Sequence, residues 1–295
     1  MERQDIDKLV ELITQRVKER LEASSTHAEP CSADDANCTA CGQCVDKREE
    51  DTRNVIQLGA SRVGAAPGVS GVASDLARYI DHTLLKPEVT REQLQELCAE
   101  ARQYSFYSVC VNSANVKLCR SLLAGSGVKV CAVVGFPLGA MSASSKAFET
   151  REAIRDGAEE IDMVINIGEL KSHNYGPVYE DIKAVTSVNP SIPVKVILET
   201  GMLELEEKII ACALSKAAGA RFVKTSTGFG KGGATAEDVA LMKRVVGNDV
   251  EVKASGGIRD RETLVAMIQA GATRVGASAS VAIVTNQKST KSTGY

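Results

Sequence analysis

Three charged side chains lie inside short apolar runs, where an unpaired charge is costly. Asp162 lies in EIDMV, Lys224 in RFVKT and Lys253 in VEVKA. A lysine amine condenses with a carbonyl once it has lost its proton, and burial or a nearby cation favours that loss. A neighbouring carboxylate moves protons at the carbon next to the imine. The trio therefore predicts Schiff-base chemistry; a purely structural salt-bridge network is the alternative reading.

The surrounding pattern indicates how these residues are held. β-branched runs alternate with amphipathic stretches, which predicts a parallel sheet, and eight such units predict a (β/α)8 TIM barrel of the α/β class. A doubly wound open sheet is the alternative, disfavoured because no G-x-G-x-x-G follows the first strand. Strands are expected at Ile80–Leu84, Phe106–Val111, Val128–Val134, Glu160–Ile165, Val194–Leu198, Arg221–Lys224, Val250–Lys253 and Arg274–Gly276. Helices are expected between the strands, for example at Arg91–Arg102, Lys146–Asp156, Leu205–Ala217, Ala236–Val246 and Arg261–Gln269.

Glycines follow the last expected strands. Gly256 and Gly257 come after the seventh strand, and Gly276 begins a Gly-Ala-Ser segment, with Ser278, at the eighth. In barrels of this kind, backbone N–H groups of those two loops often bind a phosphate. Gly228, after Lys224, would let the backbone approach the same ligand. The alternative is that these glycines only make tight turns.

Composition limits the classes of function. The chain has 295 residues, 44% hydrophobic and 25% charged, with a formal net charge of -3. No basic surface calls for nucleic acid or anionic lipid, and no apolar run is long enough to span a membrane. Without an apolar signal segment, a cytoplasmic location is expected. The nine cysteines are then better explained as thiols or metal ligands than as disulfides.

Three regions follow one another along the chain. Residues 1–23 contain an amphipathic helix, expected over Asp5–Ala23, and residues 24–74 form a Cys-containing linker. Residues 75–295 carry the barrel. The helix stripe is made of Ile6, Leu9, Val10, Ile13, Val17 and Leu21.

Several motifs together resemble the deoxyribose-phosphate aldolases. They are IDHTLL from Ile80, VCV from Val109, VGFPLG from Val134, residues 160–166, 223–228 and 253–257, and RVGAS from Arg274. The resemblance implies a class I aldolase with no metal or other cofactor. It makes Lys224 the Schiff-base lysine, Lys253 the lysine that tunes it and Asp162 the proton-relay aspartate. The implied substrate is a phosphorylated sugar, 2-deoxy-D-ribose 5-phosphate, cleaved reversibly to acetaldehyde and D-glyceraldehyde 3-phosphate.

The same resemblance extends to the substrate-binding residues. Tyr295 ends the chain, as a tyrosine that reaches the site does in some members. Ala279 departs from the family, because many members have a second serine there. Cys110 matches a cysteine near the family's site, although a small apolar core residue is the simpler interpretation. The complete set of expected substrate-binding residues is Asp81, Thr83, Cys110, Thr227, Gly228, Gly256, Gly257, Gly276 and Ser278.

The N-terminal extension resembles the encapsulation peptides that dock enzymes to bacterial microcompartment shells. Residues 5–23 would then bind a shell protein, whereas packing on the barrel or dimerisation are the alternatives. The linker cysteines suggest an iron–sulfur cluster, zinc or redox-sensitive thiols. A non-catalytic scaffold and a redox protein are the competing functions, and a homo-oligomer is left open. The linker cysteines are Cys31, Cys38, Cys41 and Cys44.

Overall fold

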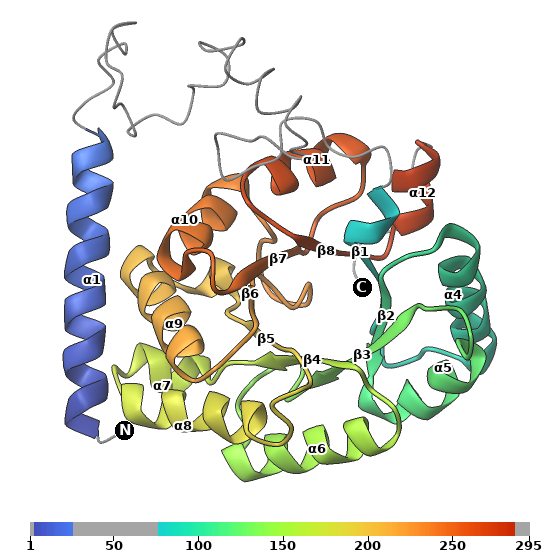
Figure 1. Ribbon diagram of the computed structural model, residues 1–295, viewed down its shortest axis with the longest axis horizontal. Coiled ribbons are helices and arrows are strands. Elements are labelled where there is room, and N and C mark those ends of the chain that lie inside the picture. Colours follow the sequence, from blue (N-terminus) through green and yellow to red (C-terminus); the bar gives the residue numbers. More distant parts are fainter. Residues whose placement is uncertain (1–2, 26–75, 287–295) are drawn as a thin grey trace, which may run out of the picture.

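The computed structural model describes residues 3–25 and 76–286. In these ranges eight parallel strands close into a barrel in chain order, with helices around it (Figure 1). The predicted (β/α)8 TIM barrel is therefore confirmed. The strands are β1 (Ile80–Leu84), β2 (Ser108–Asn112), β3 (Lys129–Val134), β4 (Glu160–Val164), β5 (Val194–Ile197), β6 (Phe222–Lys224), β7 (Glu251–Ser255) and β8 (Arg274–Ala277).

The helices cover the outside of the barrel and bury one face each. In α4 (Arg91–Tyr104), Thr90 and Gln93 form a capping box at the start, and Ser105 ends the helix in a left-handed conformation. The other helices are α5 (Val116–Leu122), α6 (Ala143–Arg155), α7 (Ile167–Lys171), α8 (Tyr175–Thr186), α9 (Leu205–Ala217), α10 (Ala236–Val246), α11 (Arg261–Gln269) and α12 (Ser280–Thr285), with short 3-10 turns at Leu76–Tyr79, Ser113–Asn115 and Thr200–Met202.

The predicted elements differ from the observed ones only at their ends. The helices at Leu205–Ala217, Ala236–Val246 and Arg261–Gln269 have the predicted bounds. The second strand begins two residues later than Phe106, because Phe106 and Tyr107 bond backbone atoms of Ala101 and Ile80 before the strand starts. The seventh strand continues to Ser255.

Alternation along each strand separates an interior face from a helix-facing one. On β1, Asp81 bonds interior residues of other strands, whereas His82 faces outward, with Nε2 2.6 Å from Glu100 of α4 and Nδ1 2.9 Å from Ser280 of α12. The outward residues join the large apolar core between barrel and helices. The interior is instead filled largely by polar and charged side chains, and that contrast marks where the chemistry lies.

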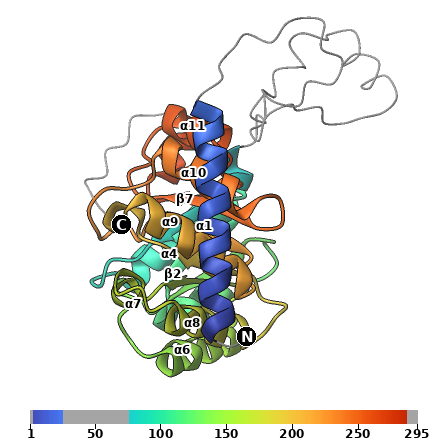
Figure 2. The ribbon, with the colours of Figure 1, turned by 90° about the vertical axis from the view of Figure 1, so that its left-hand side faces the viewer.

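The N-terminal helix α1 (Arg3–Ser25) lies outside the ring, along α8 and α9 (Figures 1 and 2). It buries Ile6 and Val10, while Lys18 forms an exposed ion pair with Glu206 at 2.8 Å. A cavity of about 830 Å³ remains between α1 and the barrel. The predicted helix is thus present and two residues longer at each end, and it is packed on the protein's own barrel.

No helix in the described ranges is long and apolar enough to cross a membrane. The expected linker, residues 24–74, lies almost entirely outside the described residues.

Candidate active site

Asp162 is the common partner of three lysines in the barrel interior. Its Oδ2 accepts hydrogen bonds from Lys224 Nζ at 2.8 Å and Lys253 Nζ at 2.7 Å, and its Oδ1 accepts one from Lys195 Nζ at 2.8 Å. The parallel register places Asp162 opposite Lys195 and Lys224 opposite Lys253 on neighbouring strands. The structure therefore brings the three predicted catalytic residues, Asp162, Lys224 and Lys253, into direct contact.

Further charged side chains, nearer the start of the strands, form ion pairs with these lysines and with one another. Asp81 lies 2.5 Å from Lys253 Nζ and 2.9 Å from Arg274 Nη1. Glu160 lies 3.0 Å from Arg274 Nη1 and 2.7 Å from Lys195 Nζ. All these side chains are at most 5% exposed. We call this set the interior charge network: Asp81, Glu160, Asp162, Lys195, Lys224, Lys253 and Arg274.

Mutual attraction keeps the network ionised despite its burial. Burial alone would raise the pKa of Asp162, but Lys195, Lys224 and Lys253 hold that pKa well below its ordinary value. Burial likewise opposes the charge on Lys253, yet the carboxylates of Asp162 and Asp81 raise the pKa of Lys253. Asp162 and Lys253 therefore stay charged at neutral pH.

Lys224 differs from the other two lysines in how firmly it is held. Lys253 contacts two carboxylates, Asp162 and Asp81, and Lys195 also contacts two, Asp162 and Glu160. Lys224 Nζ contacts the Asp162 carboxylate alone among the described residues. Lys224 also ends its strand at the C-terminal side of the barrel, where active sites of this fold lie. It is the lysine best placed to meet a substrate.

A family model described as DeoC/LacD family aldolase matches residues 76–286, a range that includes the whole interior charge network. The chain belongs to the DeoC/LacD aldolase family. The resemblance drawn from its motifs is thereby confirmed.

Named relatives agree with this membership. A deoxyribose-phosphate aldolase of Macrococcus caseolyticus is 59% identical over 72% of this chain and 97% of its own length. One of Brevibacillus brevis is 59% identical over 75% of this chain and 100% of its own length. The solved tetrameric deoxyribose phosphate aldolase of Aeropyrum pernix superposes with a TM-score of 0.68, at 32% identity over 79% of this chain and 97% of that one. These matches leave much of the N-terminal extension uncovered.

The first strand contributes two of the expected substrate-binding residues to this aldolase. The carboxylate of Asp81 is committed to Lys253, Arg274 and the Ser108 hydroxyl, which lies at 2.7 Å. Thr83, two residues closer to the barrel mouth, donates its hydroxyl to the Asp81 carbonyl at 2.8 Å. Asp81 thus has a clear place in holding Lys253, and its contact with substrate stays a prediction.

The loop after Lys224 is fastened by a glutamate that the sequence reasoning missed. Thr227 donates both its backbone N–H, at 3.2 Å, and its hydroxyl to the Glu199 carboxylate. Glu199 follows β5 in a left-handed conformation, with φ 58°, and is 3% exposed. Gly228 has φ 85°, which favours glycine. The signal for Glu199 was available, since it is an acid directly after an apolar strand.

The expected phosphate loops follow the neighbouring strands β7 and β8. Gly256 accepts a backbone hydrogen bond from Ala234 at 3.0 Å, and a Cβ on Gly233 would lie 2.5 Å from the Gly256 carbonyl oxygen. The loops after β6 and β7 therefore touch through their backbones. Gly257 is exposed with φ 80°, and Ser278 is half-buried after β8.

The lack of a side chain at Gly276 on β8 leaves space for the side chain of Lys253. A Cβ there would lie 3.2 Å from Lys253 Cε and 3.1 Å from Ser255 Cβ. The next serine along, Ser280, is already committed to the Ala277 carbonyl at 2.8 Å and to His82. With Ala279 between them, Ser278 is the serine of this segment for which phosphate binding stays a prediction.

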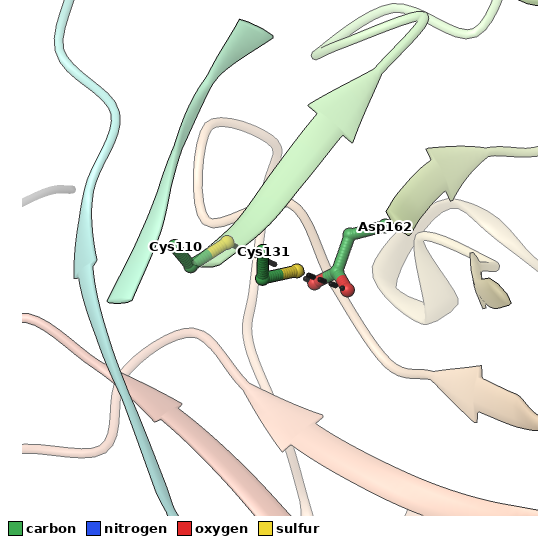
Figure 3. A group of neighbouring side chains, drawn as sticks. All are labelled: Cys110, Cys131 and Asp162. Carbon is green, nitrogen blue, oxygen red and sulfur yellow. Dashed lines mark hydrogen bonds between the residues drawn. The ribbon is translucent and has the colours of Figure 1, made fainter. Parts of the chain in front are cut away.

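Two cysteines and Asp162 gather on one side of the interior (Figure 3). Cys131 Sγ lies 3.0 Å from Asp162 Oδ1, and Cys110 Sγ lies 3.9 Å from Oδ2. Their ligand atoms lie within 4.8 Å of one another, as in a metal site. Three ammonium groups already surround Asp162, however. The hydrogen bond with Cys131 lowers the pKa of Cys110, but burial raises the pKa of Cys131, whereas a metal needs both thiolates. The electrostatics of the site therefore disfavour a bound cation.

Some predicted residues lie outside the described ranges, and some observed ones were not predicted. Tyr295 and the linker cysteines Cys31, Cys38, Cys41 and Cys44 are in the first group. Lys195, Glu160 and Arg274 are in the second, although each is a charged residue in a predicted strand. Lys195 in VKVI carried the same signal as Lys253 in VEVKA.

Proposed function

We propose that this aldolase reversibly cleaves 2-deoxy-D-ribose 5-phosphate to acetaldehyde and D-glyceraldehyde 3-phosphate through an imine on Lys224. The observation that carries the proposal is the position of Lys224, held by the Asp162 carboxylate at the C-terminal end of β6 and flanked by Lys253, whose pKa the carboxylates of Asp162 and Asp81 raise. The names of its relatives, 59% identical over nearly their whole length, supply the substrate.

In the cleavage direction, Lys224 Nζ adds to the aldehyde carbon C1, and loss of water gives the imine. As the C2–C3 bond breaks, the C3 hydroxyl loses its proton and D-glyceraldehyde 3-phosphate leaves, with an enamine remaining on Lys224. A proton then returns to C2, and hydrolysis releases acetaldehyde. Atoms and electrons balance without an external oxidant or reductant. The route therefore needs the covalent lysine and groups that carry protons.

Asp162 is the proposed proton carrier at C2. Its Oδ2 lies 2.8 Å from Lys224 Nζ and 2.7 Å from Lys253 Nζ, so protons pass between the imine region, Asp162 and Lys253 with the help of one water. At the other end of the substrate, the backbone at Gly256, Gly257 and Gly276 and the Ser278 hydroxyl would bind the phosphate. Thr83, Cys110, Thr227 and Gly228 would line the space between them.

The test is acetaldehyde formation from 2-deoxyribose 5-phosphate by the purified full chain. Lys224→Met is expected to lose at least about 10³-fold in kcat, because the nucleophile is gone. Lys208→Met is the matched control: Lys208 is ion-paired with Asp238 at 2.7 Å in the helical layer, and its loss is expected to leave kcat unchanged. Substantial activity in Lys224→Met would contradict the proposal, as would a preference for unphosphorylated deoxyribose.

We further propose that α1 docks the enzyme to a bacterial microcompartment shell, from a cytoplasmic pool of enzyme. Support comes from its place outside the matched family range, with an open groove of about 830 Å³ and the exposed Lys18–Glu206 ion pair beside it. Ile6 and Val10 would leave the barrel and bury themselves on a shell protein. A fusion of residues 1–25 to a fluorescent protein, expressed with shell proteins, should form puncta that Ile6→Asp abolishes; diffuse fluorescence would contradict the idea.

The oligomeric state of this aldolase is a separate proposal. The Aeropyrum pernix relative is described as a tetramer, and a homo-oligomer is therefore proposed here. Light scattering of the purified chain decides it, since a monomer mass at micromolar concentration would contradict the assembly.

A further inference from the structure

Lys195 holds a central position in the interior charge network without reaching Lys224. Its Nζ lies 2.8 Å from Asp162 Oδ1, 2.7 Å from Glu160 and 3.3 Å from Cys131 Sγ, and the side chain is fully buried. Because Lys195 occupies Oδ1, Lys224 and Lys253 must share Oδ2. No step of the proposed reaction uses Lys195 directly.

We propose that Lys195 is a positioning residue that sets the protonation of Lys224: its ammonium group, bound to one oxygen of Asp162, offsets part of the carboxylate charge and so weakens the attraction of Asp162 for the Lys224 ammonium. The inference rests on the proposed role of Lys224 as the imine-forming lysine. It adds a second tuning lysine on β5, on the opposite side of Lys224 from Lys253 on β7.

The charge balance of the network gives the physical reason. Four cations face three carboxylates, so the network carries one surplus positive charge while Lys224 is protonated and becomes neutral when Lys224 loses its proton. In a poorly polarisable interior the neutral state is favoured. Without the Lys195 charge, the network is neutral with Lys224 protonated and negative afterwards. Lys224 would then keep its proton to higher pH.

The other cations and the two aspartates of the network hold their charges, which leaves Lys224 as the member that responds. Arg274 stays protonated in proteins. The carboxylates of Asp162, Glu160 and Asp81 outweigh burial and raise the pKa of Lys195 well above its ordinary value. Asp81 and Asp162 remain ionised because their cations hold the pKa of each low.

Other titratable groups near Lys224 do not change this comparison. Cys110 on β2 and Cys131 on β3 approach the same Asp162 carboxylate, and Glu199 at the end of β5 holds the following loop through Thr227. Cys110 and Glu199 act alike in the wild type and in a Lys195 variant. Cys131 lies 3.3 Å from Lys195 Nζ, but burial raises its pKa and loss of that cation raises the pKa further, so Cys131 stays an uncharged thiol in both proteins. The difference between the two proteins therefore reports the Lys195 charge.

The experiment measures imine formation at Lys224 as a function of pH. Full-length wild type and Lys195→Met are incubated with acetaldehyde and cyanoborohydride, and the adduct on Lys224 is quantified by peptide mass spectrometry. For Lys195→Met, the pH of half-maximal trapping is expected to rise by about one unit, which is a tenfold loss of free amine near neutral pH. Trapping at high pH should approach that of the wild type.

A second variant keeps the test decisive if Lys195→Met does not fold. Glu160→Gln removes the other carboxylate that Lys195 contacts and leaves Lys224 contacts intact, so the network gains positive charge. Its half-maximal pH is expected to shift in the acid direction. Lys146→Met is the control: Lys146 is a fully buried, ion-paired lysine outside the barrel interior, and its loss should leave the half-maximal pH in place.

The outcomes separate the two proposals. No adduct on Lys224 of the wild type overturns the Schiff-base function itself. An adduct in the wild type with an unchanged half-maximal pH in folded Lys195→Met overturns the role of Lys195 alone. If only Glu160→Gln folds, a pH of half-maximal trapping that stays the same or rises overturns the proposed role of Lys195. Equal loss of trapping at every pH would assign Lys195 a structural role and likewise overturn the inference.

Discussion

Two buried lysine–carboxylate groups in this molecule behave in opposite ways. Between α6 and α8, Lys146 pairs with Asp181 at 2.6 Å, and its Nζ also donates to the Val164 carbonyl at 2.8 Å. Inside the barrel, Asp162 meets three lysines at 2.7–2.8 Å. In the Lys146–Asp181 pair, the cost of burial dominates, because the pKa of Lys146 is lowered and the pKa of Asp181 is raised. Around Asp162, the attraction of the three lysines dominates and lowers the pKa of that carboxyl.

The difference lies in the number of opposite charges that each group contacts. Among the described residues, Asp181 is paired with one cation, Lys146, whereas Asp162 is paired with three. One partner does not offset the cost of removing a charge from water, but several partners do. The helical pair is thus a structural contact, while the interior charge network keeps charged groups at the place where we propose that the substrate carbonyl reacts.

Among the variants that test this contrast, Asp162→Asn should have the largest effect. The amide cannot carry protons or bind three ammonium groups, so kcat for deoxyribose 5-phosphate cleavage is expected to fall by roughly 10²–10⁴-fold. Steady-state kinetics would measure this, with circular dichroism to confirm folding. Asp181→Asn makes the same chemical change in the helical pair and should keep kcat within a few fold. Similar losses in both variants would mean that Asp162 acts only structurally.

The helical pair should matter for stability instead. Lys146→Met removes one partner of a buried ion pair and leaves Asp181 alone, which typically costs about 3–5 kcal/mol in the free energy of unfolding. Because burial already raises the pKa of Asp181, that residue can take up a proton, so the loss should lie at the low end. Urea unfolding measures it. An unchanged stability would show that the pair contributes little.

The contributions of Asp162 and Asp181 to the free energy of unfolding should depend on pH with opposite signs. The pKa of Asp162 is lowered on folding, so its contribution is present above about pH 4 and is lost as the pH falls further. The pKa of Asp181 is raised on folding, so its contribution is fully present at acid pH and declines as the pH rises through the raised value.

The destabilisation caused by Asp162→Asn should therefore shrink below about pH 4, whereas that caused by Asp181→Asn should shrink toward neutral pH. Free energies of unfolding from urea titrations between roughly pH 3 and pH 7 test both signs. The same sign in both variants would refute the contrast between the two places.

The smallest expected effect comes from Gly276→Ala. The new Cβ would lie 3.2 Å from Lys253 Cε, so the lysine must shift by a few tenths of an ångström. Crowding of this kind costs about 1–3 kcal/mol, and a few-fold to tenfold fall in kcat is expected. Gly168→Ala, which would meet only Asn166 Oδ1 at 3.6 Å, is the control. Equal kinetics for both variants would show that Lys253 tolerates displacement.

The sequence predicts the barrel and the three central residues well, for a physical reason. Charged residues inside β-branched runs are costly unless they meet partners, and parallel strands bring equivalent positions together. Asp162, Lys224 and Lys253 were found in this way. Lys195 follows the same rule, so the sequence carries the same signal for it, although it is not among the predicted site residues.

Other features depend on contacts that spacing does not encode. The period of Ile6 and Val10 predicts an amphipathic helix, but it does not say that α8 and α9 cover its stripe. The commitment of Asp81 to Arg274 links residues 193 positions apart in the chain. The hold of Glu199 on Thr227 likewise depends on how two loops meet in space.

The central claim is that Lys224, among the buried lysines of the barrel, forms the imine. The most direct test is borohydride reduction of the full-length protein in the presence of 2-deoxyribose 5-phosphate, followed by peptide mapping. We expect one adduct, on Lys224, absent from Lys224→Met although that variant folds. An adduct on Lys195 or Lys253, or none in a folded protein that is supplied with substrate, would contradict the account.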